Sequence, residues 1–174
     1  QGSNNGHGIV PAPPNAWTRI FAGWEEATTF QYPGKISIQS GIQNSIAKVP
    51  IGADEYFLIE NRNNWFRDGV NIDSSRYAVW EKMNHYPSFI NVLLDSAGVK
   101  KNEYGVITNI PNYDLGLPAS GLLIWHIDEK KIQEGLGSFS VNADRKQRGI
   151  DLEEADGAQD IGYITNLFTD PSSG

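Results

Sequence analysis

Acidic residues gather near the end of the chain in a pattern suited to a hard cation. Asp151, Glu153, Asp156 and Asp160 lie close together in the sequence. Calcium prefers several carboxylate and carbonyl oxygens that converge from a turn, and Asp156-Gly157 is a turn sequence. The spacing differs from an EF-hand loop, because the D-x-D-x-D-G pattern is absent. We expect either a calcium site at these residues or a solvated acidic strand edge.

The histidines do not form a catalytic zinc motif. His7, His85 and His126 are far apart, and the chain contains no H-E-x-x-H sequence. A three-histidine zinc site would have to be assembled by the fold alone. His126 follows an apolar run, so we expect a structural histidine that is hydrogen-bonded to a carboxylate or to the backbone. We expect Asp128 to cap a short helix over 129–134.

Other catalytic patterns are weak or absent. The sequence contains no G-x-S-x-G nucleophile elbow, no P-loop and no G-x-G-x-x-G. A carboxylate pair for glycoside hydrolysis would come from Glu60, Asp128, Glu153 or Glu154. This signal is weak, since a chain with 21 acidic residues offers many such pairs.

Composition and charge narrow the class of protein. The 174 residues, 39% hydrophobic and 20% charged, suit one globular domain or a piece of a larger one. A net charge of −7 argues against nucleic acid or an anionic membrane as the main partner. The absence of cysteine excludes disulfides and thiolate metal sites. No segment is long enough for a membrane span. Because the chain begins with Gln1 and not with methionine, we expect it to be processed or cut from a longer protein.

The elements that would position these residues centre on an apolar strand within the segment 119–128, which is entered through Gly121. Its run Leu-Leu-Ile-Trp is followed by Ile127 and predicts a strand buried on both faces. In the segment 148–157, Ile150 and Leu152 alternate with acidic residues, which predicts a half-buried strand that ends in a turn. We expect this acidic strand to lie close to the apolar one.

The first part of the chain predicts a short helix followed by strands. Asn15 is the expected N-cap, and the apolar residues of the helix recur at helical spacing: Trp17, Ile20, Phe21 and Trp24. Beyond it we expect a meander of short antiparallel strands. The predicted strand segments are 28–32, 35–39, 45–51 and, more strongly, 55–62, with apolar residues on both faces of the last.

The segment 63–103 shows no clear periodicity and predicts an insertion with helical turns near 76–84 and 87–96. A further strand is expected within 105–110, and a last helix over 160–168. The predicted fold class is therefore α+β and β-rich, mainly an antiparallel sheet or sandwich, with a short amino-terminal helix and a partly helical insertion.

Three sequence blocks together resemble a known family. They are, in chain order, NAWTRIFAGW at 15–24, EYFLIENR at 55–62, and GLLIWHID at 121–128 followed by DLEEADG. In this order they resemble the region downstream of the zinc motif in immune inhibitor A-type secreted metallopeptidases. The resemblance covers residues 1–162, interrupted by 63–103, a segment that is longer than is usual there.

The resemblance implies that the longer protein is a secreted zinc endopeptidase acting on proteins or peptides. Its zinc ligands would lie in an H-E-x-x-H helix that precedes this stretch, so no family zinc ligand falls on this chain. Residues 1–26 would be the end of the catalytic domain, 27–170 a β-rich domain and 171–174 a disordered tail. The chain would then be a non-catalytic scaffold whose partner is the peptidase part, with His126 and the acidic strand architectural or holding calcium.

Two alternatives come from other classes of protein. The first is a calcium-dependent carbohydrate-binding or adhesion module of an extracellular protein, in which Trp65 and Trp80 would form the sugar platform. The second is a glycosidase with its own carboxylate pair. The other tryptophans, Trp17, Trp24 and Trp125, are expected in the core because their neighbours are apolar.

Overall fold

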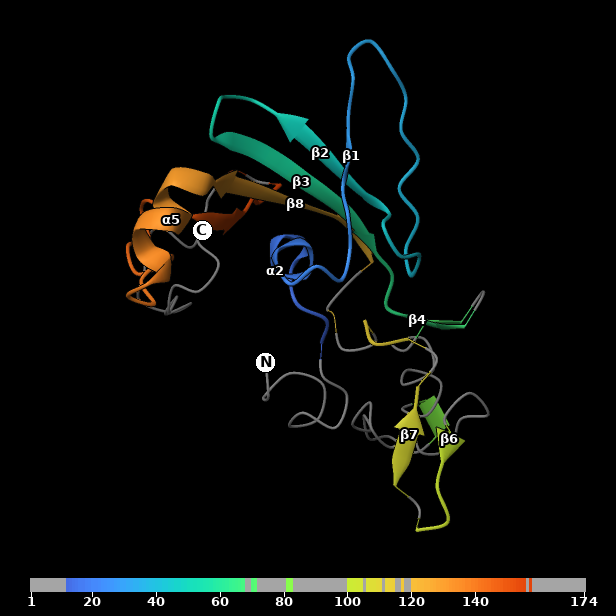
Figure 1. Ribbon diagram of the computed structural model, residues 1–174. Helices are drawn as coiled ribbons and strands as arrows, with labels where there is room; N and C mark the ends of the chain where they lie inside the picture. Colours follow the sequence, from blue (N-terminus) through green and yellow to red (C-terminus); the bar gives the residue numbers. More distant parts are fainter. Residues whose placement is uncertain are drawn as a thin grey trace.

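A five-stranded mixed sheet organises the chain in the computed structural model (Figure 1). The structure describes residues 12–67, 70–71, 81–82, 100–104, 106–110, 112–114, 117, 120–155 and 157. In chain order the elements of the main layer are α2 (Ala16–Phe21), β1 (Thr28–Thr29), β2 (Ile46–Pro50), β3 (Glu55–Arg62), β8 (Gly121–Asp128), α5 (Glu129–Leu136) and β9 (Ile150–Leu152). The predicted α+β, β-rich fold class is confirmed.

The sheet has the strand order β1-β2-β3-β8-β9. β3 and β8 pair antiparallel over their whole length, from Glu55 opposite Asp128 to Arg62 opposite Gly121. β9 pairs with β8 on its other side, which confirms that the acidic strand lies beside the apolar one. Two segments that are remote in sequence therefore form the centre of the sheet.

Two predictions about the first strands are wrong. β1 has only two residues and runs parallel to β2, so the sheet does not begin as an antiparallel meander. Residues 35–39 form no strand. Their backbone groups find side-chain partners instead of a neighbouring strand: Gln39 N donates to Ser45 Oγ at 2.6 Å, and Asn61 Nδ2 donates to the carbonyl of Ile38.

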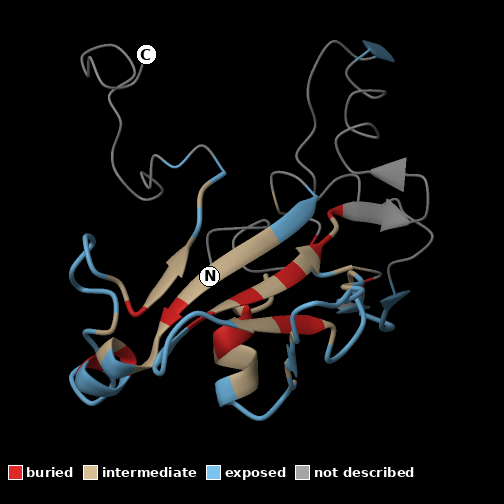
Figure 2. Ribbon diagram, turned by 90° about the horizontal axis from the view of Figure 1, so that it is seen from above, coloured by how far each residue is buried: buried red, intermediate tan, exposed pale blue. Residues whose placement is uncertain are grey.

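The main core lies on one face of the sheet, where α2 and α5 pack. It combines Ala16 and Trp17 of α2 and Ile132 of α5 with strand residues of the same face, namely Ile46, Tyr56, Leu58 and Ile127. Figure 2 shows the buried residues along β3, at the end of β8 next to α5, and in the first turn of α2. Burial of this apolar surface is the main stabilising contribution.

The prediction that β8 is buried on both faces is wrong. Only Ile127 is buried, while Leu122 is 59% exposed. The helices cover the face that carries Trp125 and Ile127, whereas Leu122 lies on the opposite face of the strand. β3 shows the same asymmetry, because Phe57 is only half-buried while the neighbouring Leu58 is buried.

Helix α2 begins and ends where its local sequence directs. Asn15 Oδ1 accepts a hydrogen bond from Thr18 N at 2.8 Å, which confirms the predicted N-cap. The helix ends at Phe21, and Gly23 adopts φ 71°, a conformation that favours glycine. Trp24 therefore lies beyond the helix and is 59% exposed, so its prediction as a core residue is wrong. Trp17 is buried and Trp125 packs against the core, as expected.

Helix α5 is the helix that Asp128 was predicted to cap. Asp128 Oδ1 accepts from Lys131 N at 3.0 Å, and the helix continues past Glu134 to Leu136. Gly135 is buried within it. A Cβ atom at Gly135 would lie 2.7 Å from Val141 N, so this glycine permits close contact with the returning loop.

The remaining described elements form two small sheets. β4 (Trp65–Arg67) pairs with β5 (Val70–Asn71), and β6 (Lys100–Lys101) pairs with β7 (Ile107–Asn109). β7 confirms the strand expected within 105–110. Of the helices predicted at 76–84, 87–96 and 160–168, the structure describes only residues 81–82, which are helical; the rest and the tail 171–174 lie outside the described residues.

Candidate functional site

The predicted cation site is only partly covered by the described residues. Asp151 lies on β9, where its Oδ1 accepts from Arg148 NH1 at 2.6 Å and from Leu152 N at 3.1 Å. Glu153 follows on the exposed edge, and its backbone N donates to the Ile124 carbonyl at 2.8 Å. Asp156 and Asp160 lie outside the described residues. A cation bound to Asp151 would therefore compete with Arg148 for the same carboxylate.

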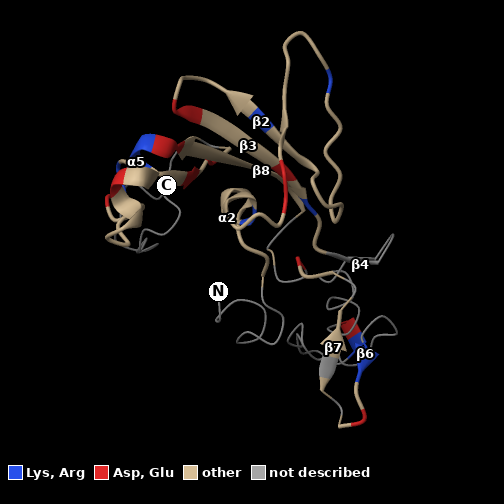
Figure 3. Ribbon diagram, viewed as in Figure 1, with Lys and Arg blue, Asp and Glu red and all other residues tan. Residues whose placement is uncertain are grey.

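The side chains of His126 and Asp128 make structural contacts at one end of the sheet. His126 Nε2 lies 3.1 Å from Glu55 Oε2, and its ring centroid is 5.5 Å from that of Phe57. Asp128 is opposite Glu55 in the β3–β8 register and caps α5. Figure 3 shows these acidic ends of β3 and β8 at the same end of the sheet, next to α5. The geometry is that of a carboxylate-bound histidine and a capping aspartate.

Within the described ranges, no three or more histidine, aspartate or glutamate side chains come together in a way that could hold a metal ion. Zinc therefore finds no ligand set in this part of the chain. His7 and His85 lie outside it, as does Trp80, and nothing is described of the Trp65 side chain. None of the helices in the described ranges combines the length and the apolar character that crossing a bilayer requires.

A buried ion cluster is the feature that the sequence analysis missed. Glu60, which is 2% exposed, accepts four hydrogen bonds. Its Oε2 accepts from Arg19 NH2 at 2.6 Å and from Arg62 Nε at 2.8 Å. Its Oε1 accepts from Trp125 Nε1 at 2.8 Å and from Arg62 NH2 at 3.2 Å. A carboxylate has about four acceptor positions, so Glu60 is saturated by its neighbours and is not free for the glycosidase role considered above.

Arg62 joins Glu60 to a second carboxylate. Its NH1 donates to Asp114 Oδ1 at 2.6 Å, and both residues are 7% exposed. Burial alone would lower the pKa of Arg62, but the hydrogen bond and charge of Glu60, followed by those of Asp114, raise this pKa above its ordinary value. The guanidinium is therefore a permanent cation inside the protein.

Arg19 connects the same cluster to helix α2. Its Nε donates to Glu25 Oε1 at 3.1 Å, and its NH1 donates to the Pro14 carbonyl at 2.5 Å. These charged side chains line a cleft of about 270 Å³, together with Gln39, Gln43, Ser45 and Asn61 among others. The signal that could have revealed the cluster is the period-two spacing of Glu60 and Arg62, which places both on the buried face of β3 with Leu58.

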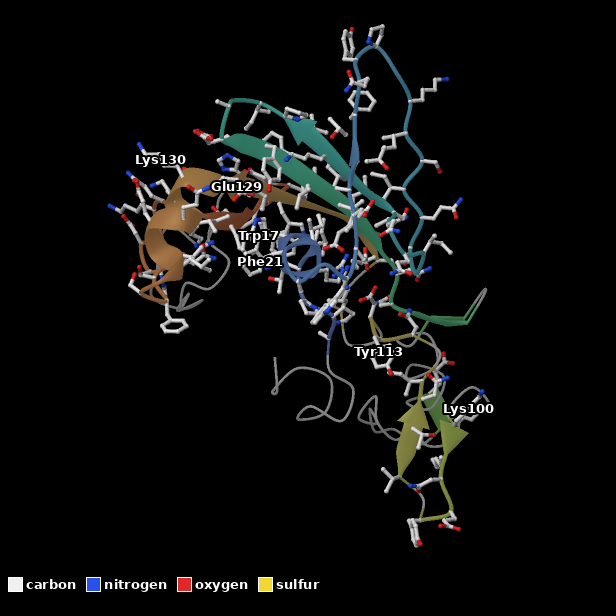
Figure 4. All side chains as sticks on the ribbon, in the orientation of Figure 1. Trp17, Phe21, Lys100, Tyr113, Glu129 and Lys130 are labelled. Carbon is white, nitrogen blue, oxygen red and sulfur yellow. The ribbon has the colours of Figure 1, made fainter. Side chains whose placement is uncertain are left out.

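A second polar junction connects α2, β3 and α5 at Glu129. Glu129 Oε1 accepts from Trp17 Nε1 at 3.3 Å and from the Tyr56 hydroxyl, and Figure 4 shows Glu129 near Trp17. Burial, with the hydrogen bond and charge of Glu129, raises the pKa of Tyr56 well above its ordinary value. Lys48 Nζ lies 3.7 Å from the centroid of the same ring. Tyr56 is therefore a neutral, fixed donor that holds the helices against the sheet.

Comparisons of the chain with protein-family models, with curated proteins and with solved structures find no match.

Proposed function

We propose that this chain is the non-catalytic scaffold of a secreted zinc metalloendopeptidase that resembles immune inhibitor A. The observation that carries the proposal is the pairing of β3 with β8 residue for residue. These strands are the two most specific blocks of the resemblance, EYFLIENR and GLLIWHID. The block NAWTRIFAGW contains α2, and the block DLEEADG begins in β9. All the blocks therefore contribute to one structural unit.

The packing of α2 supports a scaffold role. On this proposal α2 is the helix that closes the peptidase domain. Ala16 and Trp17 are buried in the same core as the strands, and Arg19 is bonded to Glu60 of β3. A helix fixed in this way would transmit the rigidity of the sheet to the peptidase part.

Apolar groups beside α2 mark where that part would contact the scaffold. Phe21 is 63% exposed, and its ring is stacked on Trp17 with centroids 4.8 Å apart. Trp24, three positions further along the chain, is also exposed. Large apolar side chains that stay exposed close together are typical of interaction surfaces. We expect the peptidase part to cover Phe21 and Trp24.

The test compares the isolated chain with the full product of its gene. We expect the isolated chain, incubated with zinc and a denatured protein substrate, to show no proteolysis, because it contains no H-E-x-x-H sequence. The full product is expected to carry this motif upstream and to cleave the substrate. Substitution of the motif glutamate by glutamine should abolish cleavage. Proteolysis by the isolated chain, or a gene product without a zinc motif, would overturn the proposal.

The same preparation separates the proposal from the carbohydrate-binding alternative. The isolated chain is titrated with oligosaccharides in the presence and absence of calcium. We expect no saturable binding. Calcium-dependent sugar binding, together with a gene product that lacks the peptidase motif, would identify an adhesion module instead.

A further inference from the structure

The carbonyl of Pro14 is held by two arginines from different elements. Arg19 of α2 donates to it from NH1 at 2.5 Å, and Arg62 of β3 donates from NH2 at 3.0 Å. Pro14 immediately precedes Asn15, the N-cap of α2. Hydrogen bonds from a cationic donor are roughly twice as strong as neutral ones. The point at which the chain enters α2 is therefore tied to both the helix and the sheet.

The two arginines are themselves fixed in place. Glu60 accepts from both of them, and Asp114 accepts from Arg62. The arginine and Glu60 side chains are only 3–11% exposed. A guanidinium that swung away would leave a buried carboxylate without its partner, which is strongly unfavourable. The donors that meet at Pro14 are thus preorganised.

We propose that Arg19 and Arg62 form a carbonyl clamp that sets the direction in which the chain before α2 approaches the sheet. Pro13 and Pro14 restrict the backbone on the amino-terminal side, so a direction fixed at Pro14 carries over to the residues before it. The Asn15 cap fixes only the helix end, because its side chain bonds to Thr18 within the same helix. The clamp adds the connection to the sheet.

The consequence for the longer protein rests on the proposed function. If the peptidase part precedes this chain, Arg19 and Arg62 act as positioning residues that orient it on the scaffold. The clamp itself is a property of this chain and is measurable without any peptidase activity. Its failure and the failure of the proposed function are therefore distinguishable.

The experiment measures how variable the position of the chain before α2 is, as the width of the distance distribution between two spin labels. The sequence contains no cysteine, so Ala12→Cys and Lys130→Cys together provide two unique sites for spin labels. Lys130 is exposed on α5, and Ala12 lies just before the prolines. In the parent protein we expect one narrow distance distribution in double electron–electron resonance. Arg62→Lys and Arg19→Lys keep the charge but lack the planar fork needed to bond several acceptors at once, so we expect the narrow peak to be lost.

Arg148→Lys is the matched control. It makes the same chemical change in the ion pair between Arg148 and Asp151 of β9. β9 is separated from β3, the strand of Arg62, by β8, so this variant should leave the distance distribution narrow. A second readout is the carbonyl ¹³C chemical shift of Pro14, which should move in both clamp variants and not in the control. If Arg62→Lys does not fold, Arg19→Lys decides alone. A folded Arg19→Lys variant with the parent's distance distribution and Pro14 shift would overturn the clamp.

Discussion

Glu60 connects three elements through one carboxylate on the buried face of β3. It accepts from Arg19 of α2, from Arg62 of its own strand and from Trp125 of β8. Such a group is costly to bury alone, and its partners are equally costly without it. The stability of the fold therefore depends on the complete cluster rather than on any single pair.

Replacing Glu60 by glutamine tests this dependence. The amide would place an N–H group against arginine donors and remove the charge that balances them, so we expect Glu60→Gln to lower the free energy of unfolding by about 3–5 kcal/mol. Urea denaturation measures the loss. Glu26→Gln, on the exposed surface, is the control and should stay within about 0.5 kcal/mol of the parent. Equal stabilities of the two variants would contradict the role given to the cluster.

Tyr56 gives a prediction about alkaline pH. Its raised pKa means that the folded protein keeps the phenol proton above about pH 10, where the unfolded chain releases it. The stabilisation is therefore complete below about pH 10 and is lost as the pH rises toward the folded-state pKa. We expect the unfolding free energy of the parent to fall more steeply above about pH 10 than that of Tyr56→Phe.

Urea unfolding across this pH range measures the Tyr56 effect. Tyr32→Phe removes a phenol from the surface and serves as the matched control, so its pH profile should follow the parent. Parallel profiles for the parent and Tyr56→Phe would mean that the Tyr56 proton is not linked to folding.

In helix α5, helix propensity and tertiary packing favour different residues at position 135, which is Gly135. Alanine is the better helix former by about 1 kcal/mol, but its Cβ would lie 2.7 Å from Val141 N and 2.8 Å from Val141 Cα. We expect Gly135→Ala to destabilise the protein by about 1–3 kcal/mol, since backbone atoms cannot move aside easily. Gly137→Ala, where a Cβ meets nothing within 4 Å, is the control in chemical denaturation. A stabilised Gly135→Ala variant would show that this contact is relaxed.

The start of the same helix depends on Asp128. Its carboxylate accepts from Lys131 N, so Asp128→Ala should cost about 1 kcal/mol. Asp128→Asn keeps an acceptor oxygen and should cost less. Thermal unfolding of the two variants measures the difference. An equal loss in both would indicate that the negative charge of Asp128 matters rather than its capping bond.

At the scale of the whole molecule, the exposed aromatic surface beside α2 gives a prediction about the partner. Provided that the proposed function holds, the double substitution Phe21→Ser and Trp24→Ser should weaken binding of a separately produced peptidase part at least about tenfold, or ~1.4 kcal/mol. Calorimetric titration measures the affinity. Tyr104→Ser, at an exposed turn between β6 and β7, is the control. Unchanged affinity in the double variant would place the contact elsewhere.

Elements whose signals are local could be predicted from the sequence. Asn15 and Asp128 mark helix starts because a cap bonds to a backbone N–H three residues further along. β3 begins and ends as predicted, and β8 lies within the predicted segment 119–128, since alternation and flanking turn residues act within a few positions. The fold class followed from these elements.

Contacts between side chains that are distant in the sequence depend on the tertiary fold and could not be predicted. Arg19 and Glu60 are separated by 41 positions, and Arg62 and Asp114 by 52, so no local pattern couples them. The strand order of the sheet and the packing of α2 bring them together. The same packing leaves Trp24 exposed, although Trp24 continues the helical spacing of Trp17, Ile20 and Phe21. The physical reason is that burial depends on which face another element covers, and that choice is made by the whole fold.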